Sequence, residues 1–376
     1  MRIYFGAYWF LDASIPVINS LTKRHSLFVV TTQGAMQKAG ALGDDLIASG
    51  VTLRCETPIK LKNPLYWWQR AVGVWQGVKR FRCDVIHLQE VADPFLDWLL
   101  IRLQRVPLVL TVHDPAPHMG ELGFMKYYQQ RRPLVEELRR RADWIIVPGS
   151  DTRRQLLDLH PELTDERVTV IPLGVYDYFL RWQRPEHAEK PGTVLFFGRI
   201  NAYKGLGVLL DAWERVVTEC PQARLVIAGQ GYDLPNYRER ILRDPQCVLI
   251  DRFVSSQEVA QLFTEASLVV LPYVEATQSG VVSVALAFGK PAVVTSVGSL
   301  PEMVEDGVSG LVVPPRDPDA LATAIVRLLR DEPLRRKMEE GARHLASSRF
   351  SNEVLAQQAE EVYHRAVAHR RGYSSA

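Results

Sequence analysis

Two cations and a polar turn carry the residue types that bind a diphosphate. Arg199 and Lys204 stand five residues apart, directly after the apolar run Thr193–Phe197. Ser279 and Gly280 stand between a second apolar run and an uncharged helical stretch. The first N–H groups of a helix lack intrahelical partners and lie at the positive end of its dipole, so this position favours a phosphate. The two cations would offset the charge of the phosphate, including the charge that grows on it as a leaving group; as solvated loop cations they would need no ligand.

These residues must be positioned by strands, because each group follows an apolar, β-branched run. Such runs alternate with longer helical patterns along the chain, which is typical of βαβ units and parallel sheets. In the first half the expected strands are Arg2–Phe5, Leu27–Thr32, Val51–Arg54, Asp84–Leu88, Leu108–Val112, Trp144–Val147 and Val168–Ile171. In the second half they are Thr193–Phe197, Arg224–Ala228, Val248–Ile250, Leu268–Leu271, Ala292–Thr295 and Gly310–Val313. Two similar sets predict an α/β chain with two Rossmann-like domains, and 376 residues exceed the roughly 250 to 300 that a single core reaches.

The composition is that of an ordinary globular chain. Hydrophobic residues make up 47% and charged residues 23%, and the net charge of only +2 argues against a nucleic-acid partner. Cys55, Cys83, Cys220 and Cys247 form no close pair, so neither a zinc site nor a disulfide framework is indicated. The longest stretch without Asp, Glu, Lys or Arg, Ala276–Gly289, is too short to span a bilayer, and the N-terminus lacks an apolar signal core. We therefore expect a cytoplasmic protein.

Two further motifs carry less information. Asp317-Pro-Asp319 has the spacing of a metal-binding pair, but Asp317 followed by Pro318 is better explained as a helix N-cap. Gly229-Gln-Gly231 indicates a strand-to-loop turn. The first predicted strand is not followed by Gly-x-Gly-x-x-Gly, which disfavours a dinucleotide oxidoreductase. We predict no metal and no cofactor.

The motifs of the second half resemble those of the retaining glycosyltransferases of family 4. The family's signature is a Gly-Arg followed a few residues on by Lys-Gly, and later a loop that enters a helix before Gly-x-Pro. In this chain the motifs are Gly198-Arg199, Lys204-Gly205, Ser279-Gly280 and Gly289-Lys-Pro291. The resemblance continues through Leu225–Gly229, Arg252–Ala260 and Gly298–Pro314, and extends more loosely over the first half.

The resemblance implies the glycosyltransferase-B fold, in which two Rossmann-like domains with parallel sheets face each other across a cleft. Residues 1–175 would form an acceptor-binding domain and residues 191–350 a nucleotide-sugar-binding domain, with the polar stretch 183–192 as the linker. Residues 351–376 would hold a C-terminal helix, over Glu353–His369, that crosses back to the first domain. The donor would be a nucleotide-diphosphate sugar of the UDP or GDP type.

The resemblance also implies roles for individual residues. Arg199 and Lys204 would hold the diphosphate, His113 would face the donor sugar, and these three form the predicted catalytic set. Arg252 and Phe253 follow a strand where the family holds the nucleobase. The predicted donor-binding residues are Gly198, Arg199, Lys204, Arg252, Phe253, Glu275, Gln278, Ser279, Gly280, Val281 and Glu302. Glu302 is explained equally well as an acid in the first turn of a helix.

The chain departs from the family pattern at two places. Most members carry two glutamates with seven residues between them, which contact the donor sugar and the ribose; Ala276 and Val284 stand there in this chain. Glu275 is one residue early and would serve only if the loop were shifted. A subset of bacterial polysaccharide-assembling members reads Ala-Thr-Gln-Ser-Gly here, as 276–280 do, so we interpret the departure as a subfamily trait rather than a loss of activity.

The acceptor side is predicted from the first half, because ligands of open α/β sheets bind beyond the carboxyl ends of the strands. His113 and Asp114 end one predicted strand, with a structural histidine as the alternative for His113. The predicted acceptor-binding residues are Tyr8, Trp9, Asp114 and His118. His118 stands in a Pro-containing loop and is equally consistent with a simple exposed position. His87 lies inside a strand pattern and is expected in the core.

Basic residues gather in two segments of the first half. Between Thr57 and Arg82 there are six basic side chains and no acidic one, together with aromatic residues that include Tyr66, Trp67, Trp68 and Trp75. This segment is either a core-packing helix that begins at Asn63-Pro64 or a surface that touches anionic lipid or an anionic acceptor. The second segment, with Arg131-Arg132 and Arg139–Arg141, is expected to be a solvated helix face.

The predicted function is that of a metal-independent, retaining, hexosyltransferase-type glycosyltransferase. It would move a sugar to a saccharide or lipid-linked acceptor in cell-surface polysaccharide or glycolipid synthesis, with peripheral contact to the inner face of the plasma membrane. The leaving phosphate itself would take the acceptor proton, so the protein supplies positioning and charge stabilisation. Two alternatives remain: a sugar-nucleotide epimerase of the same fold, and a degenerate partner subunit that binds nucleotide without turnover.

Overall fold

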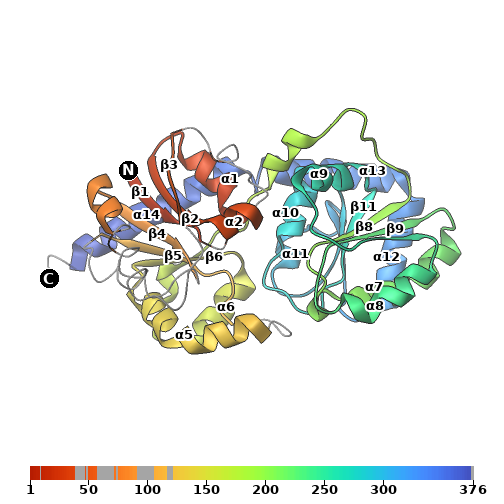
Figure 1. The fold of residues 1–376 in the computed structure, drawn as a ribbon, viewed down its shortest axis with the longest axis horizontal. Helices are drawn as coiled ribbons and strands as arrows, with labels where there is room; N and C mark the ends of the chain where they lie inside the picture. Colours follow the sequence, from red (N-terminus) through yellow and green to blue (C-terminus); the bar gives the residue numbers. More distant parts are fainter. Residues whose placement is uncertain are drawn as a thin grey trace. The chain divides into compact units, whose positions relative to one another are not determined.

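The computed structural model describes residues 1–8, 10–38, 47, 50–56, 72, 75–90, 106–116 and 122–373. These residues form two compact units, each built on one parallel sheet (Figure 1). Unit 1 holds the described residues up to Pro172 together with those from Asn352 onward. Unit 2 holds the described residues from Leu173 to Ser351.

The sheet of unit 1 has seven described strands, in the order β3-β2-β1-β4-β5-β6-β7. They are β1 (Arg2–Gly6), β2 (Ser26–Thr32), β3 (Thr52–Glu56), β4 (Val85–Gln89), β5 (Leu108–Thr111), β6 (Trp144–Val147) and β7 (Val168–Val170). Every residue of β4, β5 and β6 is buried, as expected for parallel strands covered on both faces. The predicted strands of the first half are confirmed, with ends shifted by at most two residues.

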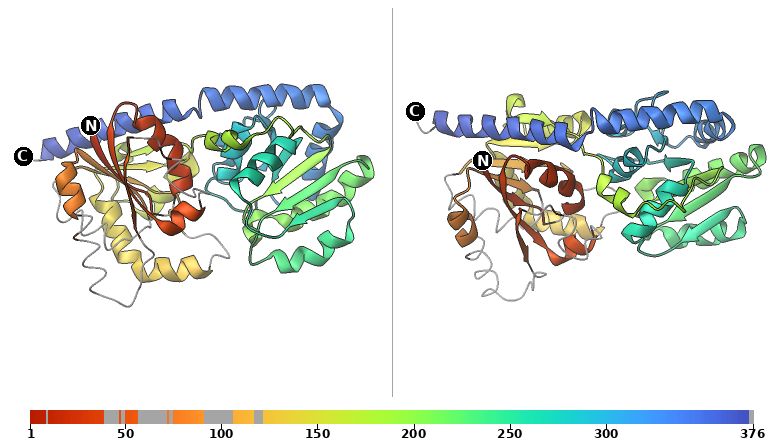
Figure 2. Two further views of the ribbon diagram at one scale, coloured as in Figure 1. Left: turned by 45° about the horizontal axis from the view of Figure 1, so that its top comes forward. Right: turned by 90° about the horizontal axis from the view of Figure 1, so that it is seen from above.

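The helices of unit 1 include one that follows all of unit 2 in the sequence. The described elements are α1 (Leu11–Leu21), α2 (Gln33–Lys38), α5 (Leu122–Arg141), α6 (Ser150–Leu159), the short 3-10 helix η2 (Asp165–Arg167) and α14 (Asn352–Tyr373). Figure 2 shows α14, in dark blue, beside α1, and it also packs on β5 and β6. Its buried Tyr363 hydroxyl lies 2.7 Å from Nδ1 of His87, and Arg370 pairs with Asp143 at 2.7 Å. These contacts make α14 part of unit 1.

The sheet of unit 2 has six described strands, in the order β10-β9-β8-β11-β12-β13. They are β8 (Thr193–Phe197), β9 (Arg224–Ala228), β10 (Cys247–Ile250), β11 (Leu268–Leu271), β12 (Ala292–Thr295) and β13 (Gly310–Val313). Five of these six have the bounds predicted from the sequence, and β10 begins one residue earlier. Its helices are η3 (Asp177–Trp182), η4 (Ala202–Lys204), α7 (Leu206–Glu219), α8 (Leu234–Arg243), α9 (Ser256–Glu265), α10 (Gly280–Ala287), α11 (Leu300–Met303), α12 (Pro318–Arg330) and α13 (Glu332–Ser347).

The predicted linker, 183–192, lies within unit 2. Glu189 bonds Arg336 of α13 at 2.9 Å, and Lys190 bonds Glu265 of α9 at 2.7 Å. The stretch is polar because its side chains form ion pairs on the surface of unit 2. The division between the units therefore lies earlier in the chain, after Pro172.

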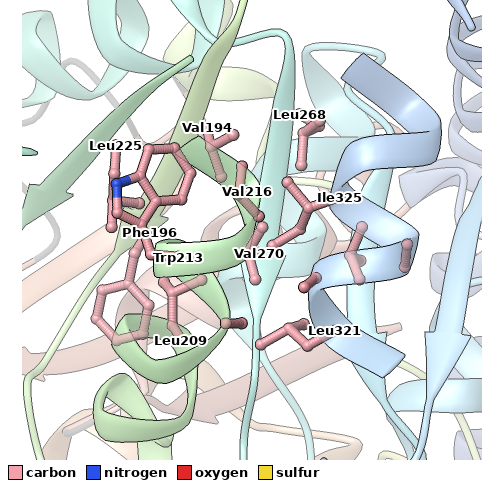
Figure 3. Close-up of a cluster of buried hydrophobic side chains, with 14 of the residues drawn as sticks. Val194, Phe196, Leu209, Trp213, Val216, Leu225, Leu268, Val270, Leu321 and Ile325 are labelled. Atoms are coloured by element: carbon pink, nitrogen blue, oxygen red, sulfur yellow. The ribbon is translucent and has the colours of Figure 1, made fainter. Parts of the chain in front are cut away.

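The core of unit 2 fixes α7 behind the loop that follows β8. Leu206, Leu209, Leu210, Trp213 and Val216 recur at helical spacing on one side of α7, and each is at most 3% exposed. Figure 3 shows the indole of Trp213 among apolar side chains of the sheet, with side chains of α12 packed alongside. Truncating such a buried tryptophan costs about 3 to 5 kcal/mol, so this packing holds α7 firmly against the sheet.

Candidate functional site

The predicted donor-binding residues lie on loops that leave the carboxyl edge of the unit 2 sheet. Strands β8, β11 and β12 are neighbours in the sheet, and the chain leaves them at Phe197, Leu271 and Thr295. Because the strands are parallel, the loops that follow them leave the same edge, where ligands of open α/β sheets bind. Arg199 and Lys204 are on the first loop, 275–281 on the second, and Glu302 follows the third.

The loop after β8 is held by the turn after β9. The N–H of Ile200 donates to the carbonyl of Gln230 at 2.8 Å. A Cβ at Gly229 would overlap the carbonyl oxygen of Gly198, and one at Gly231 would overlap that of Ile200. The Gly229-Gln-Gly231 turn therefore serves close backbone packing, and it supports the loop that carries Arg199.

Gly205 allows the loop after β8 to approach the loop after β11. Its φ of +68° lies in the left-handed region, and a Cβ there would overlap the carbonyl oxygen of Pro272. Beside this contact, the N–H of Val274 donates to the carbonyl of Tyr203 at 2.8 Å. The Lys-Gly motif thus has a structural reason: only glycine fits directly after Lys204.

Lys204 rests on a buried aromatic ring. Its Nζ lies 3.7 Å from the ring centroid of Tyr273 and 4.9 Å from that of Tyr203. Such cation–π contacts are worth roughly 0.5 to 2 kcal/mol, with the larger value for desolvated pairs. Burial raises the pKa of Tyr273 above its usual value, so its hydroxyl stays protonated. Tyr273 is not among the predicted site residues, although it stands beside the predicted loop.

The N-terminus of α10 is capped by Ser279. The Oγ of Ser279 accepts from the N–H of Val281 at 3.3 Å and lies 3.2 Å from the hydroxyl of Tyr273. The expectation of unpaired N–H groups in this turn is therefore wrong for Val281, because the serine side chain occupies its donor. An anion at this site would therefore find the N–H of Val281 already bonded, but it would still be attracted by the positive end of the helix dipole.

The structure brings the Gly-Arg and Ser-Gly motifs into contact. A Cβ at Gly198 would lie 3.5 Å from Cγ2 of Val281, which is ordinary van der Waals distance. Arg199 is exposed directly after this glycine, and Lys204 is half-buried. Tyr176 covers the other side of the turn, since a Cβ at Gly280 would lie only 2.9 Å from its hydroxyl. Tyr176 is likewise not among the predicted site residues.

The two positions that carry glutamate in most of the family are buried here. Ala276 and Val284 are 6% and 3% exposed, whereas Glu275 and Gln278 are half-buried. The loop after β12 packs on the same segment, because the N–H of Ser299 donates to the carbonyl of Thr277 at 3.0 Å. That loop leads directly into α11, where Glu302 is half-buried, so the third predicted loop also reaches the site.

Arg252 and Phe253 follow β10 at the same edge of the sheet. The guanidinium of Arg252 bonds Glu258 at 2.9 Å, and Glu258 completes the capping box of α9 with Ser255. The pKa of Glu258 is lowered to about 2, chiefly by the hydrogen bond from Arg252. Phe253 is 61% exposed. The structure therefore gives Arg252 a role at the helix cap and leaves the ring of Phe253 accessible to a ligand.

In unit 1, His113 is a buried residue at the end of β5. Its Nε2 lies 2.6 Å from Oε1 of Gln89, and its ring stacks on Phe10 at 3.9 Å. Burial lowers the pKa of His113 to about 4, so the imidazole is neutral at pH 7. Asp114 is half-buried beside it. Tyr8 is 2% exposed with its hydroxyl 2.9 Å from that of Tyr4, which is a core position rather than an open binding surface.

Several other predictions can be compared with the described residues. His87 is in the core as predicted, with Nε2 2.7 Å from Oγ1 of Thr111. Asp317 caps α12 as predicted, since it accepts from the N–H of Ala320 at 2.9 Å. Among the described residues, no group of three or more His, Cys, Asp and Glu side chains could hold a metal ion. Within the same ranges, no helix has the length and apolarity to cross a membrane.

Some predictions concern residues outside the described ranges. These are Trp9 and His118 of the predicted acceptor site, and 57–71, 73 and 74 of the basic segment. The described part of that segment includes a short helix over 75–81, in which Nζ of Lys79 lies 5.1 Å from the ring centroid of Trp75.

One of the basic residues expected on a solvated helix face is buried instead. Arg139 of α5 is 0% exposed and bonds Glu90 at 2.9 Å and the carbonyl of Pro115 at 3.1 Å. The prediction is wrong for this residue. Glu90, which directly follows β4, is buried, and Arg139 is buried with it because the two side chains form an ion pair. Arg140 and Arg141 do lie on the surface, where both pair with Glu137. Arg139 therefore holds the loop that follows His113.

Both halves of the sequence match known families. The model described as "Glycosyltransferase Family 4" matches residues 17–177, and the model described as "Glycosyl transferases group 1" matches residues 191–331. An uncharacterized glycosyltransferase of Methanocaldococcus jannaschii is 26% identical over 84% of this chain and 85% of its own length. The alpha-D-kanosaminyltransferase of Streptomyces kanamyceticus is 27% identical over 79% of this chain and 82% of its own length.

The fold recurs in solved structures. Anabaena HepE, determined in complex with UDP-glucose, superposes with a TM-score of 0.71 at 18% identity, over 96% of this chain and 98% of its own. The chain has two Rossmann-like units with parallel sheets, and the second unit presents two cations beside a helix N-terminus. Its class is that of the enzymes with the glycosyltransferase-B fold. The chain belongs to glycosyltransferase family 4.

Proposed function

We propose that this glycosyltransferase is retaining and metal-independent, and that it transfers a sugar from a nucleotide-diphosphate sugar to a saccharide or lipid-linked acceptor. The observation that carries the proposal is the convergence of Arg199, Lys204 and the N-terminus of α10 on one edge of the unit 2 sheet. Two cations and a helix dipole suit a diphosphate. HepE, which shares the fold, was solved with UDP-glucose, and this supports a donor of the same class.

In the proposed reaction, the bond between the anomeric carbon and the distal phosphate oxygen breaks. The acceptor hydroxyl forms its bond to the anomeric carbon on the same face, and its proton passes to an oxygen of the leaving diphosphate. The negative charge that grows on the diphosphate is stabilised by Lys204 and Arg199. Within this scheme no protein side chain serves as the base, and the neutral His113 contacts the donor sugar.

Nucleotide binding is the first test of the proposal. A thermal-shift screen of UDP, GDP and ADP without added metal should identify a nucleotide diphosphate that raises the melting temperature, because a ligand of the native state stabilises it. The donor with the matching base is then assayed for transfer, and the anomeric configuration of the product is read by NMR. An inverted product would contradict the retaining mechanism.

Two alternatives are separated by the same reagents. An epimerase would convert the donor in the absence of any acceptor, so the nucleotide sugar recovered from such an incubation should contain an epimer. A degenerate partner subunit, suggested by Ala276 and Val284, would bind the nucleotide but give no product in a single turnover. Transfer of sugar in a single turnover, with no epimer in the donor that remains, supports the proposed function over both alternatives.

We also propose a role in cell-surface polysaccharide or glycolipid synthesis, at the inner face of the plasma membrane. The support is the sequence between Thr57 and Arg82, which combines six basic and five aromatic side chains with no acid. Each cation close to an anionic lipid surface contributes about 1 kcal/mol of attraction. Such a segment would recruit the enzyme to a membrane-bound acceptor.

A further inference from the structure

We infer that Tyr273 is the positioning residue of the donor site, and that it holds both the Lys204 ammonium and the cap of α10 in place. The inference rests on the proposed function of this site. Tyr273 is the side chain that joins the two predicted motifs: its ring centroid lies 3.7 Å from Nζ of Lys204, and its hydroxyl lies 3.2 Å from Oγ of Ser279.

The ring of Tyr273 is itself rigidly held. Only 1% of the residue is exposed, and Oγ1 of Thr295, at the end of β12, donates to its carbonyl at 2.6 Å. The ring of Tyr203 meets it edge-on, with centroids 6.4 Å apart and planes at 78°. The next residue, Val274, donates its N–H to the carbonyl of Tyr203 at 2.8 Å. The backbone at and directly after Tyr273 is therefore anchored by hydrogen bonds, and its ring is buried against the ring of Tyr203.

A rigid ring restricts a flexible cation. A lysine side chain has four rotatable bonds, and fixing them in the transition state opposes catalysis through lost entropy. The electron-rich face of Tyr273 attracts the ammonium before any ligand is present, so part of that entropy is already lost in the free enzyme. The side of the ammonium that faces away from the ring would then face the proposed diphosphate. A preorganised charge of this kind acts where negative charge develops.

The hydroxyl of Tyr273 has a separate task. A serine hydroxyl has two acceptor positions, and when the phenol donates, Ser279 accepts from both Tyr273 and the N–H of Val281. This arrangement fixes the rotamer of the cap and therefore the geometry of the first turn of α10. The hydroxyl should affect binding of the diphosphate, whereas the ring should affect the position of Lys204 in the transition state.

A double-mutant cycle with Lys204 tests the inference. Tyr273→Leu should lower kcat by about tenfold or more in the otherwise unchanged enzyme, but by less than about twofold in the Lys204→Ala background, because the ring acts through the lysine. Tyr273→Met is a second variant without a ring, for use if the leucine variant folds poorly. Tyr273→Phe keeps the ring and should leave kcat within about twofold while the KM for the donor rises roughly threefold.

Tyr363→Phe is the matched control. It removes another fully buried tyrosine hydroxyl, but in unit 1, where the hydroxyl bonds His87. It should lower the melting temperature without changing the KM for the donor. An equal loss of kcat from Tyr273→Leu in both backgrounds would overturn the inference, since that pattern indicates a general structural role.

The affinity for UDP and GDP, measured by calorimetry on the same four cycle members, separates this inference from the proposed function. A nucleotide that binds the unchanged protein, combined with an additive cycle in kcat, overturns only the role of Tyr273. If neither nucleotide binds and no sugar is transferred, the proposed function and the inference fail together. A coupled cycle with nucleotide binding supports both.

Discussion

Replacing Gly205 by alanine should separate backbone strain from displacement of the donor site. Gly205 has a φ of +68°, and Gly307 has a φ of +75° in the same unit. A Cβ at Gly307 meets nothing within 4 Å, whereas a Cβ at Gly205 would overlap the carbonyl oxygen of Pro272. Left-handed backbone costs a residue with a Cβ about 1 to 2 kcal/mol. Both variants should lose this amount, and only Gly205→Ala must also move two loops apart.

The displacement should be visible in catalysis. Relief of the overlap at Gly205 requires a shift on the order of 1 Å, and a shift of that size at a positioned group can lower the rate about a hundredfold. We therefore expect Gly307→Ala to transfer sugar at the normal rate, with a free energy of unfolding lower by about 1 to 2 kcal/mol. Gly205→Ala should be less stable than Gly307→Ala and should lose most of its kcat.

Urea unfolding and initial rates at saturating donor are the measurements for this pair. Equal stability and equal kcat in the two variants would refute the reasoning, because the contact between Gly205 and Pro272 would then carry no constraint. A stability loss at Gly205→Ala with a normal kcat would show that the loops relax without moving Lys204.

Four further outcomes are expected. Arg199→Ala and Lys204→Ala should each lower transfer about a hundredfold to a thousandfold while the fold stays intact, since losing a charged stabiliser of the transition state costs about 3 to 4 kcal/mol; near-normal turnover in both would contradict the diphosphate site. Transfer should survive EDTA, and a loss that Mg²⁺ or Mn²⁺ restores would show that a metal was missed. Charge reversal at Lys60 and Lys62 should weaken binding to anionic vesicles at low salt while transfer to a small soluble acceptor is unchanged; vesicle binding that is absent at low salt would refute the membrane role. Burial lowers the pKa of His87 to about 3, so the unfolded chain takes up its proton below about pH 6.5 while the folded protein does not. The free energy of unfolding should therefore fall as pH drops from about 6.5 toward 3, by up to about 1.4 kcal/mol per pH unit for this group, and less steeply in His87→Phe; identical pH profiles in urea titrations would contradict this.

The sheets could be predicted from the sequence because parallel strands are buried on both faces. A strand such as β11 is a continuous apolar run between polar stretches, and this pattern marks both its type and its ends. The loops at the carboxyl edge followed from the same pattern. Arg199 and Lys204 could be placed there because they directly follow β8.

Contacts between distant segments could not be predicted in the same way. Lys204 and Tyr273 are 69 positions apart, and Arg139 and Glu90 are 49 positions apart, so no local periodicity relates either pair. Arg139 stands among three arginines of similar local pattern, and only its position on the inward face of α5 distinguishes it. The ion pair with Glu90 and the ring beneath Lys204 depend on the tertiary structure.

The place of α14 in unit 1 has a consequence for biosynthesis. Residues Asn352–Tyr373 leave the ribosome only after all of unit 2 has been made, although they pack against α1, β5 and β6. The described residues of unit 2 run unbroken from Leu173 to Ser351, so this unit can reach its native state while unit 1 still lacks a helix. Domains usually fold in the order in which they emerge from the ribosome. In this protein unit 1 begins to emerge first, but its last helix is made after unit 2. Until Tyr363 arrives beside His87, the apolar face over β5 and β6 is open to chaperones and proteases.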